Sequence, residues 1–171
     1  VREGLATGGQ LRYTAQQYGH AFGLSVEGVA VDGEVAGRLT ADWRQTWWRG
    51  AVTLRLKGGL AQGSDMVPQM ALRAGGLNTV RGYDFGVASG DALWSAQLDL
   101  MRAGRGAVKT VLFADAGQAG RRDAFGDAPF LSGAGVGVTV LGGIIRAELS
   151  HPITERAGRG LRFDLIFGGT R

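Results

Sequence analysis

Cysteine is absent from this 171-residue sequence, and proline occurs only three times. Without cysteine the chain has neither a disulfide framework nor a thiolate metal site. Its two histidines, His20 and His151, stand apart without other ligands at suitable spacing, so we expect no metal and no cofactor. No apolar run reaches the roughly 20 residues of a transmembrane helix. The absence of a long apolar run still allows a membrane-spanning β-barrel, because each of its strands needs only about ten alternating residues.

The sequence also lacks a concentrated run of charge. Lys and Arg number 19 against 15 Asp and Glu, which gives a formal net charge of +4. The basic residues are scattered singly among acids, whereas nucleic-acid-binding proteins cluster them on one face. We therefore expect no nucleic-acid partner. No signal peptide is visible at Val1, so an exported protein would have to be processed or represented here by a fragment.

Glycine, in contrast, is abundant, with 31 residues. It shows neither the period of three of collagen nor a low-complexity tract. Runs that alternate between apolar and polar residues accompany it, and this alternation predicts β-strands because successive strand side chains point to opposite faces. The nine runs are residues 10–16, 22–31, 35–44, 52–60, 94–100, 108–115, 133–140, 145–150 and 161–167.

The polar faces of these runs favour the lumen of a barrel over the surface of a soluble sandwich. They carry Gly, Ser, Thr and isolated charges of both signs, where a solvated surface would be rich in Lys and Glu. The predicted fold class is therefore all-β, a transmembrane antiparallel up-and-down β-barrel whose apolar faces meet lipid. A soluble ligand-binding β-sandwich is the alternative. The barrel predicts that five side chains point outward: Leu98, Leu112, Val136, Leu149 and Phe163.

The odd number of strands bears on completeness. Bacterial single-chain barrels have even strand numbers, and lipid tolerates no open sheet edge. Either the first run is not a membrane strand, or more of the barrel precedes Val1. In the second case, residues 1–171 are one partial barrel domain with an unpaired edge at residues 10–15. Residues 62–90 form the longest loop between the predicted strands.

The most unusual string of the sequence lies in that loop and runs from Gly75 to Asp84, GGLNTVRGYD. Its glycines, Gly75, Gly76 and Gly82, permit backbone angles that other residues resist. The loop can therefore reverse tightly and present one long cation, Arg81, on a defined hairpin.

A cation held in place on a hairpin, as we expect for Arg81, usually needs an acidic partner. A guanidinium offers five donors in a rigid fork, which suits it to bridging two carboxylates. Asp99 and Asp115 lie on the polar faces of two consecutive predicted strands. We therefore predict that the loop folds into the lumen and places Arg81 near both. Two roles for this contact stay open: it only stiffens the barrel, or it takes a direct part in the protein's function.

Glycines also alternate along residues 133–137. The Gly-x-Gly-x-Gly string is superficially similar to a dinucleotide-binding loop, but it lacks the strand-then-helix context that cradles phosphate. We predict instead that these glycines thin the inner wall and leave room for the folded-in loop.

Two motifs together resemble the bacterial outer-membrane assembly and translocation superfamily. That group contains the BamA and TamA proteins and the two-partner-secretion transporters. In it, the glycine-arginine motif lies on a sixth extracellular loop tucked into a 16-stranded barrel. The resemblance covers roughly residues 50–171. It implies that the chain is the C-terminal half of such a barrel and that residues 62–90 are its long extracellular loop, folded into the lumen. The residues that carry it are Gly75, Gly76, Val80, Arg81, Gly82, Tyr83, Phe113, Asp115 and Gly117.

The resemblance implies a non-enzymatic protein of the bacterial outer membrane. Its activity would be to assemble outer-membrane proteins or to translocate polypeptides. Its partners would be outer-membrane lipid, unfolded or exported polypeptide, and periplasmic modules or other assembly subunits. The alternatives are a barrel anchor for an exported enzyme domain, and a passive pore or structural barrel.

Overall fold

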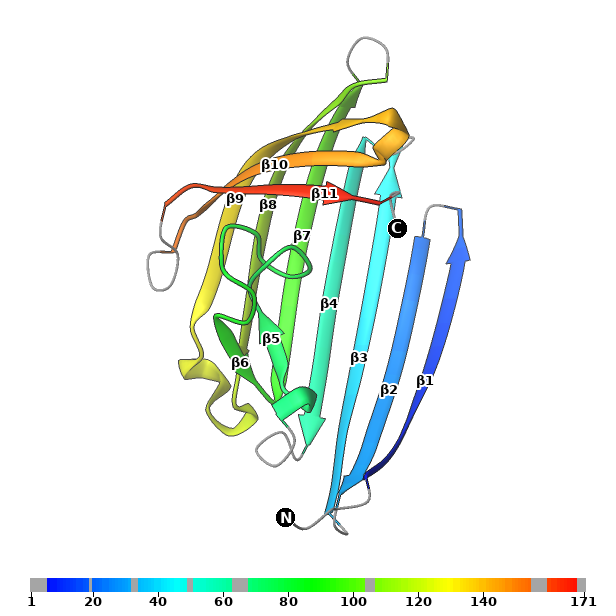
Figure 1. Ribbon diagram of the computed structural model, residues 1–171, viewed down its shortest axis with the longest axis vertical. Helices are drawn as coiled ribbons and strands as arrows, with labels where there is room; N and C mark the ends of the chain where they lie inside the picture. Colours follow the sequence, from blue (N-terminus) through cyan, green and yellow to red (C-terminus); the bar gives the residue numbers. More distant parts are fainter. Residues whose placement is uncertain are drawn as a thin grey trace.

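Nine long strands form one antiparallel sheet in the computed structural model (Figure 1). The structure describes residues 6–18, 20–31, 34–48, 51–62, 68–103, 107–154 and 160–168. The long strands are β1 (Ala6–Gln17), β2 (His20–Val31), β3 (Glu34–Trp47), β4 (Val52–Gln62), β7 (Ala92–Ala103), β8 (Lys109–Gly120), β9 (Phe130–Val140), β10 (Ile145–Pro152) and β11 (Arg162–Phe167).

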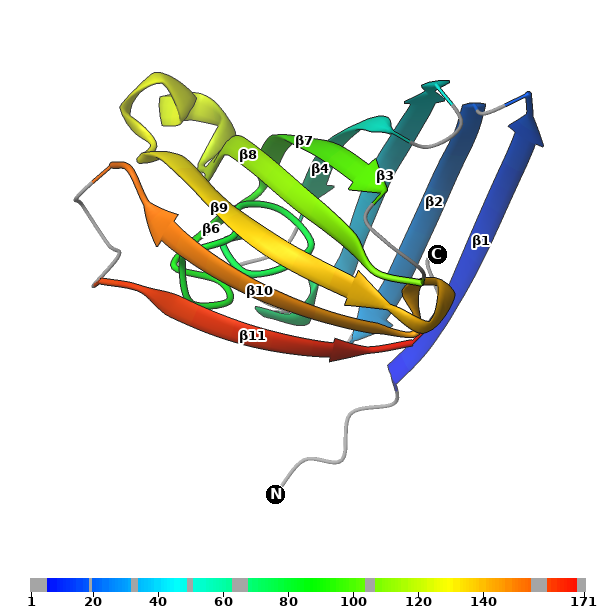
Figure 2. The ribbon, with the colours of Figure 1, turned by 90° about the horizontal axis from the view of Figure 1, so that it is seen from above.

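The strand order follows the chain, with β1 and β11 at the two ends of the sheet. β1 pairs with β2 along its whole length, and β11 pairs with β10. Seen from above, the sheet curves around a concave face (Figure 2). All nine predicted strands are confirmed, and so is the all-β, up-and-down antiparallel architecture of a partial β-barrel.

The connection between β4 and β7 has structure of its own, which the sequence did not predict. It contains β5 (Leu72–Ala74) and β6 (Ala88–Gly90), which pair with each other. Three-residue strands are too short to show alternation, so the pattern gave no sign of them. We call residues 68–90 the inward loop, because they lie on the concave side of the sheet (Figure 2). Residues 63–67 of the predicted loop lie outside the described residues.

Helical structure within the described ranges consists of short 3-10 segments. These are η2 (Pro68–Met70), η3 (Arg122–Asp127) and η4 (Leu141–Gly143). No helix in this part of the chain has both the length and the apolar character to cross a membrane.

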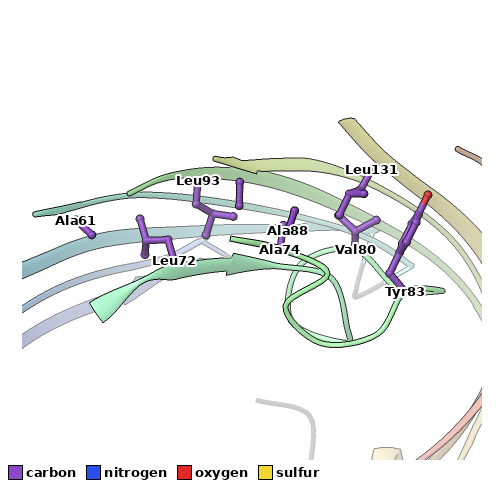
Figure 3. Close-up of a cluster of buried hydrophobic side chains, with 9 residues drawn as sticks. Ala61, Leu72, Ala74, Val80, Tyr83, Ala88, Leu93 and Leu131 are labelled. Carbon is purple, nitrogen blue, oxygen red and sulfur yellow. The ribbon is translucent and has the colours of Figure 1, made fainter. Parts of the chain in front are cut away.

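A cluster of buried apolar side chains fills the contact between the inward loop and the concave face (Figure 3). Buried apolar side chains in mutual contact are what defines a hydrophobic core. The loop contributes Leu72, Ala74, Val80, Tyr83 and Ala88, and the long strands contribute Ala61, Leu93, Ala119 and Leu131. The loop is therefore packed as part of the protein's interior.

The opposite, convex face carries exposed apolar side chains. Four of the five predicted outward residues are at least 39 % exposed, and Leu98 is half-buried. Each alternates along its strand with a neighbour on the concave face, for example Leu112 with Phe113. The predicted alternation is therefore confirmed. Rows of exposed apolar residues are what a lipid-facing wall requires.

Cysteine labelling tests which solvent meets each face, because these residues contain no native cysteine. In the full-length protein in membranes, we expect Leu112→Cys to react with a lipid-soluble maleimide and to resist a charged one. Thr40→Cys, on the concave face, should show the reverse preference. If Leu112→Cys reacted mainly with the charged reagent, the convex face would not be in lipid.

Candidate functional site

The inward loop turns back sharply at its glycines. Gly75, Gly76 and Gly82 have φ angles of +104°, +84° and +94°, in the region that glycine adopts without strain. A Cβ at Gly75 would also overlap the carbonyl oxygen of Asp84. The Thr79 hydroxyl accepts from the Gly75 amide at 2.9 Å and donates to the Gly75 carbonyl at 3.0 Å. The reversal predicted for these three glycines is confirmed.

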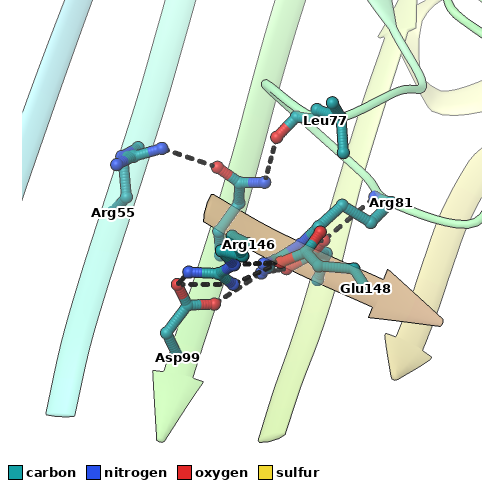
Figure 4. A network of polar contacts seen from close by, with 8 residues as sticks. Arg55, Leu77, Arg81, Asp99, Arg146 and Glu148 are labelled. Carbon is teal, nitrogen blue, oxygen red and sulfur yellow. Dashed lines mark hydrogen bonds and ion pairs between the residues drawn. The ribbon is translucent and has the colours of Figure 1, made fainter. Parts of the chain in front are cut away.

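This reversal presents Arg81 to the strands β7 and β8 (Figure 4). Its Nε donates to Oδ2 of Asp115 at 2.7 Å, and its Nη2 donates to Oδ1 at 2.6 Å. The Arg81 backbone amide donates to the same carboxylate at 2.9 Å. Nη2 also lies 2.7 Å from Oδ1 of Asp99. The structure thus brings Arg81 together with both predicted carboxylates, while their role as a lock on the loop stays a prediction.

A third carboxylate, which the sequence did not single out, completes the site. Nη1 of Arg81 donates to Oε1 of Glu148 on β10 at 3.1 Å. A second cation, Arg146, pairs with Glu148 and lies 3.3 Å from Oδ2 of Asp99. We call these five residues the arginine cluster: Arg81, Arg146, Asp99, Asp115 and Glu148. Two guanidinium groups and three carboxylates give it a formal charge of −1.

The glycines of β9 let side chains from β8 and β10 meet. Glu148 lies opposite Gly137 of β9, and Gly137 in turn lies opposite Val111 of β8. Since β9 presents no side chains at Gly133, Gly135 and Gly137, the carboxylates of its two neighbours reach one guanidinium across it. The predicted thinning of the inner wall is confirmed at Gly133, where an added Cβ would overlap the Arg81 carbonyl oxygen.

The guanidinium group of Arg81 lies over the aromatic ring of Phe113. The guanidinium carbon of Arg81 lies 3.8 Å from the centre of the Phe113 ring, within the range of a cation–π contact. The ring fits because it lies opposite Gly135, where a Cβ would come within 2.5 Å of its Cζ. Gly117 leaves similar room for Val80, whose Cγ2 would lie 3.0 Å from an added Cβ. The resemblance named Phe113 and Gly117 as residues of the family motif, but it did not predict these contacts.

Tyr83 and its neighbours attach the loop to the next strands. The buried Tyr83 hydroxyl lies 2.9 Å from the carbonyl oxygen of Ser132 and 2.8 Å from that of Thr154. Asp84 forms a 2.7 Å ion pair with Arg162 of β11. The string from Val80 to Asp84 therefore bonds or packs against strands from β7 to β11.

Electrostatics favour a permanent charge on the loop. Burial disfavours the charged guanidinium, but the hydrogen bond and charge of Asp115, with the charges of Asp99 and Glu148, outweigh it and raise the pKa of Arg81 above its ordinary value. Arg81 therefore stays protonated throughout the physiological pH range. Within the described ranges, no group of three or more His, Cys, Asp or Glu side chains is arranged to hold a metal ion. This geometry is suited to holding the loop in place.

Part of the chain is similar to a known protein family. Residues 38–140 match the family described as haemolysin secretion/activation protein ShlB/FhaC/HecB. The matched span is more than half of the chain and contains the inward loop, Arg81, Asp99 and Asp115. No curated protein matches the chain. Within the superfamily suggested by the motifs, the match supports the two-partner-secretion transporters and gives no specific support to BamA or TamA.

Proposed function

Because this chain belongs to the haemolysin secretion/activation protein family ShlB/FhaC/HecB, we propose that it translocates a polypeptide across the bacterial outer membrane. Members of this family are two-partner-secretion transporters. The observation that carries the proposal is the family match itself, which spans the inward loop and the two carboxylates on β7 and β8. The residues form the wall of an outer-membrane barrel in this proposal, with the convex face in lipid and the inward loop entering from the extracellular side.

The position of the loop supports a passage through the barrel. The arginine cluster holds the loop against β7, β8 and β10. Beside the loop, the concave face of β1–β4 borders a hollow of about 990 Å³. A loop fixed to one side of the wall leaves the other side open to a polypeptide. We therefore assign the arginine cluster the role of a lock that keeps the passage clear.

Assembly of outer-membrane proteins is the other activity of the superfamily that the motifs resemble. The matched family is described by secretion and activation, so we propose translocation alone. The described residues offer no specific observation that favours a passive pore or an enzyme anchor.

Deleting the gene in the bacterium that makes the protein tests translocation. We expect one or a few exported proteins to disappear from the medium and the cell surface, while other outer-membrane proteins keep their levels. The full-length gene should restore export, and so should an Arg121→Ala variant, because Arg121 lies in an exposed ion pair with Asp123. A general loss of outer-membrane proteins would indicate assembly, and an unchanged set of exported proteins would contradict translocation.

A further inference from the structure

The hollow beside the inward loop is large, and charged and polar side chains line it together with apolar ones. It lies between the concave face of β1–β4 and loop residues that include Gln69, Arg73 and Asn78. Its volume of about 990 Å³ is at the upper end of the roughly 300–1,000 Å³ that is usual for small-molecule sites. A single inorganic ion would fill little of this space.

The charges that line the hollow are mostly of one sign. Asp42 is its one acidic residue among those described, and Arg38 is paired with Glu27 from outside the lining. Three other acids of the inner wall, Asp99, Asp115 and Glu148 on β7, β8 and β10, are engaged by Arg81 and Arg146. The basic lining residues are Arg12, Arg38, Arg44, Arg55, Lys57 and Arg73.

Two of the basic side chains are placed where they repel each other, whereas Lys57 lies opposite Asp42. Arg44 of β3 lies directly opposite Arg55 of β4, and like charges in that position destabilise a sheet. Arg55 uses one donor on the amide oxygen of Gln97, at 3.4 Å. In the described part of the chain, no carboxylate lies within ion-pair distance of Arg55 or Lys57. Natural proteins retain such local conflicts mainly at functional sites.

We call the basic residues that line the hollow the basic wall. We propose that this basic wall binds an acidic, extended segment of the exported polypeptide as it passes, an inference that rests on the proposed function. Arg55 and Lys57 are alternate residues of one strand, so their Cα atoms lie about 6.4–6.8 Å apart along it. An extended segment with acids at every second position repeats at the same distance. The charged residues of the hollow lie on the concave face, so its anionic ligand comes from the polypeptide and not from lipid headgroups.

The exposure of the wall suits transport. Arg55 and Lys57 are half-buried, and each contact with a carboxylate beside water is individually weak. Passage requires binding that is favourable enough for entry and weak enough for release, spread over several sites. A row of separate cations meets that requirement better than one tight pocket.

Peptide binding to the purified full-length protein in nanodiscs tests the inference. The probe is a fluorescent peptide of alternating Glu and Ser, compared with a Gln-Ser peptide of equal length. We expect the acidic peptide to bind about tenfold more tightly, and added salt to reduce the difference. The Arg55→Gln/Lys57→Gln variant should lose most of this preference. A matched control, Lys109→Gln/Arg121→Gln, removes the same charge outside the hollow and should keep the preference.

A charge-conserving variant, Arg55→Lys/Lys57→Arg, separates loss of charge from misfolding, since it should still bind the acidic peptide. Equal binding of the two peptides, or an unchanged preference in Arg55→Gln/Lys57→Gln, would overturn the inference. Competition by free phosphate as effective as that of unlabelled acidic peptide would also overturn it, because it would indicate a simple anion site. If the wild type restores export in the deletion strain without binding the peptide, the proposed function stands and this inference is wrong. If it restores no export, both are wrong.

Discussion

Replacing Arg81 with alanine is expected to abolish most export and to lower the temperature at which the folded barrel unfolds. The change leaves Asp115 and Glu148 buried, and among the described residues it leaves Asp115 without any side-chain donor. Removing one partner of a buried ion pair costs about 3–5 kcal/mol. Water reduces this figure at Asp99, whose side chain is 20 % exposed. Gel mobility after heating and recovery of the exported protein measure the two effects.

Lysine at position 81 should give an intermediate result, since it keeps a charge but lacks the fork that spans several carboxylates. Asp115→Asn should add little to Arg81→Ala, because the contact is already broken. Fully additive losses in that double-mutant cycle would show that Arg81 and Asp115 do not interact. Arg121→Ala is the matched control: its ion pair with Asp123 is exposed, so stability should change little.

Adding a single methyl group at Gly133 is expected to dislodge the inward loop. A Cβ there would overlap the carbonyl oxygen of Arg81, so the loop backbone must move away from β9. Overpacking of this kind costs about 1–3 kcal/mol, and here it also displaces Arg81 from its carboxylates. We expect Gly133→Ala to lower the unfolding temperature and to make the loop sensitive to added protease.

Gly28→Ala provides the comparison for that change. Gly28 lies on β2, and the nearest atom to an added Cβ is the Ala36 carbonyl oxygen at 3.9 Å, an ordinary contact. Both substitutions therefore place the same methyl group on a strand, but only one meets the loop. If the two variants unfolded at the same temperature and were digested equally, close packing of the loop on β9 would be wrong.

The strands could be predicted because each carries its own alternating pattern, independent of its neighbours. The same pattern put Asp99 and Asp115 on the concave face, where both contact Arg81. Whether those contacts act as a lock stays a prediction that the Arg81 variants test.

Glu148 and Arg146 could not be predicted as members of the cluster, although the alternation placed both on the polar face of their strand. Their contact with Arg81 and Asp99 depends on the register of three paired strands and on the missing side chains of β9. The alternating pattern of a single strand does not show how that strand is aligned with its neighbours. Tyr83 is similar, because its hydroxyl bonds to two backbone carbonyls whose positions follow from the packed loop.

The partners of Arg81 are spread widely along the chain, which has a consequence for the order of folding. Asp99, Asp115 and Glu148 follow it by 18, 34 and 67 residues. Contacts this distant form late, because the entropy of closing each intervening segment is lost before the contact compensates for it. The arginine therefore gains its last carboxylate only when β10 has taken its place beside β9. A loop with all three carboxylates on Arg81 therefore marks a wall whose later strands are already in register.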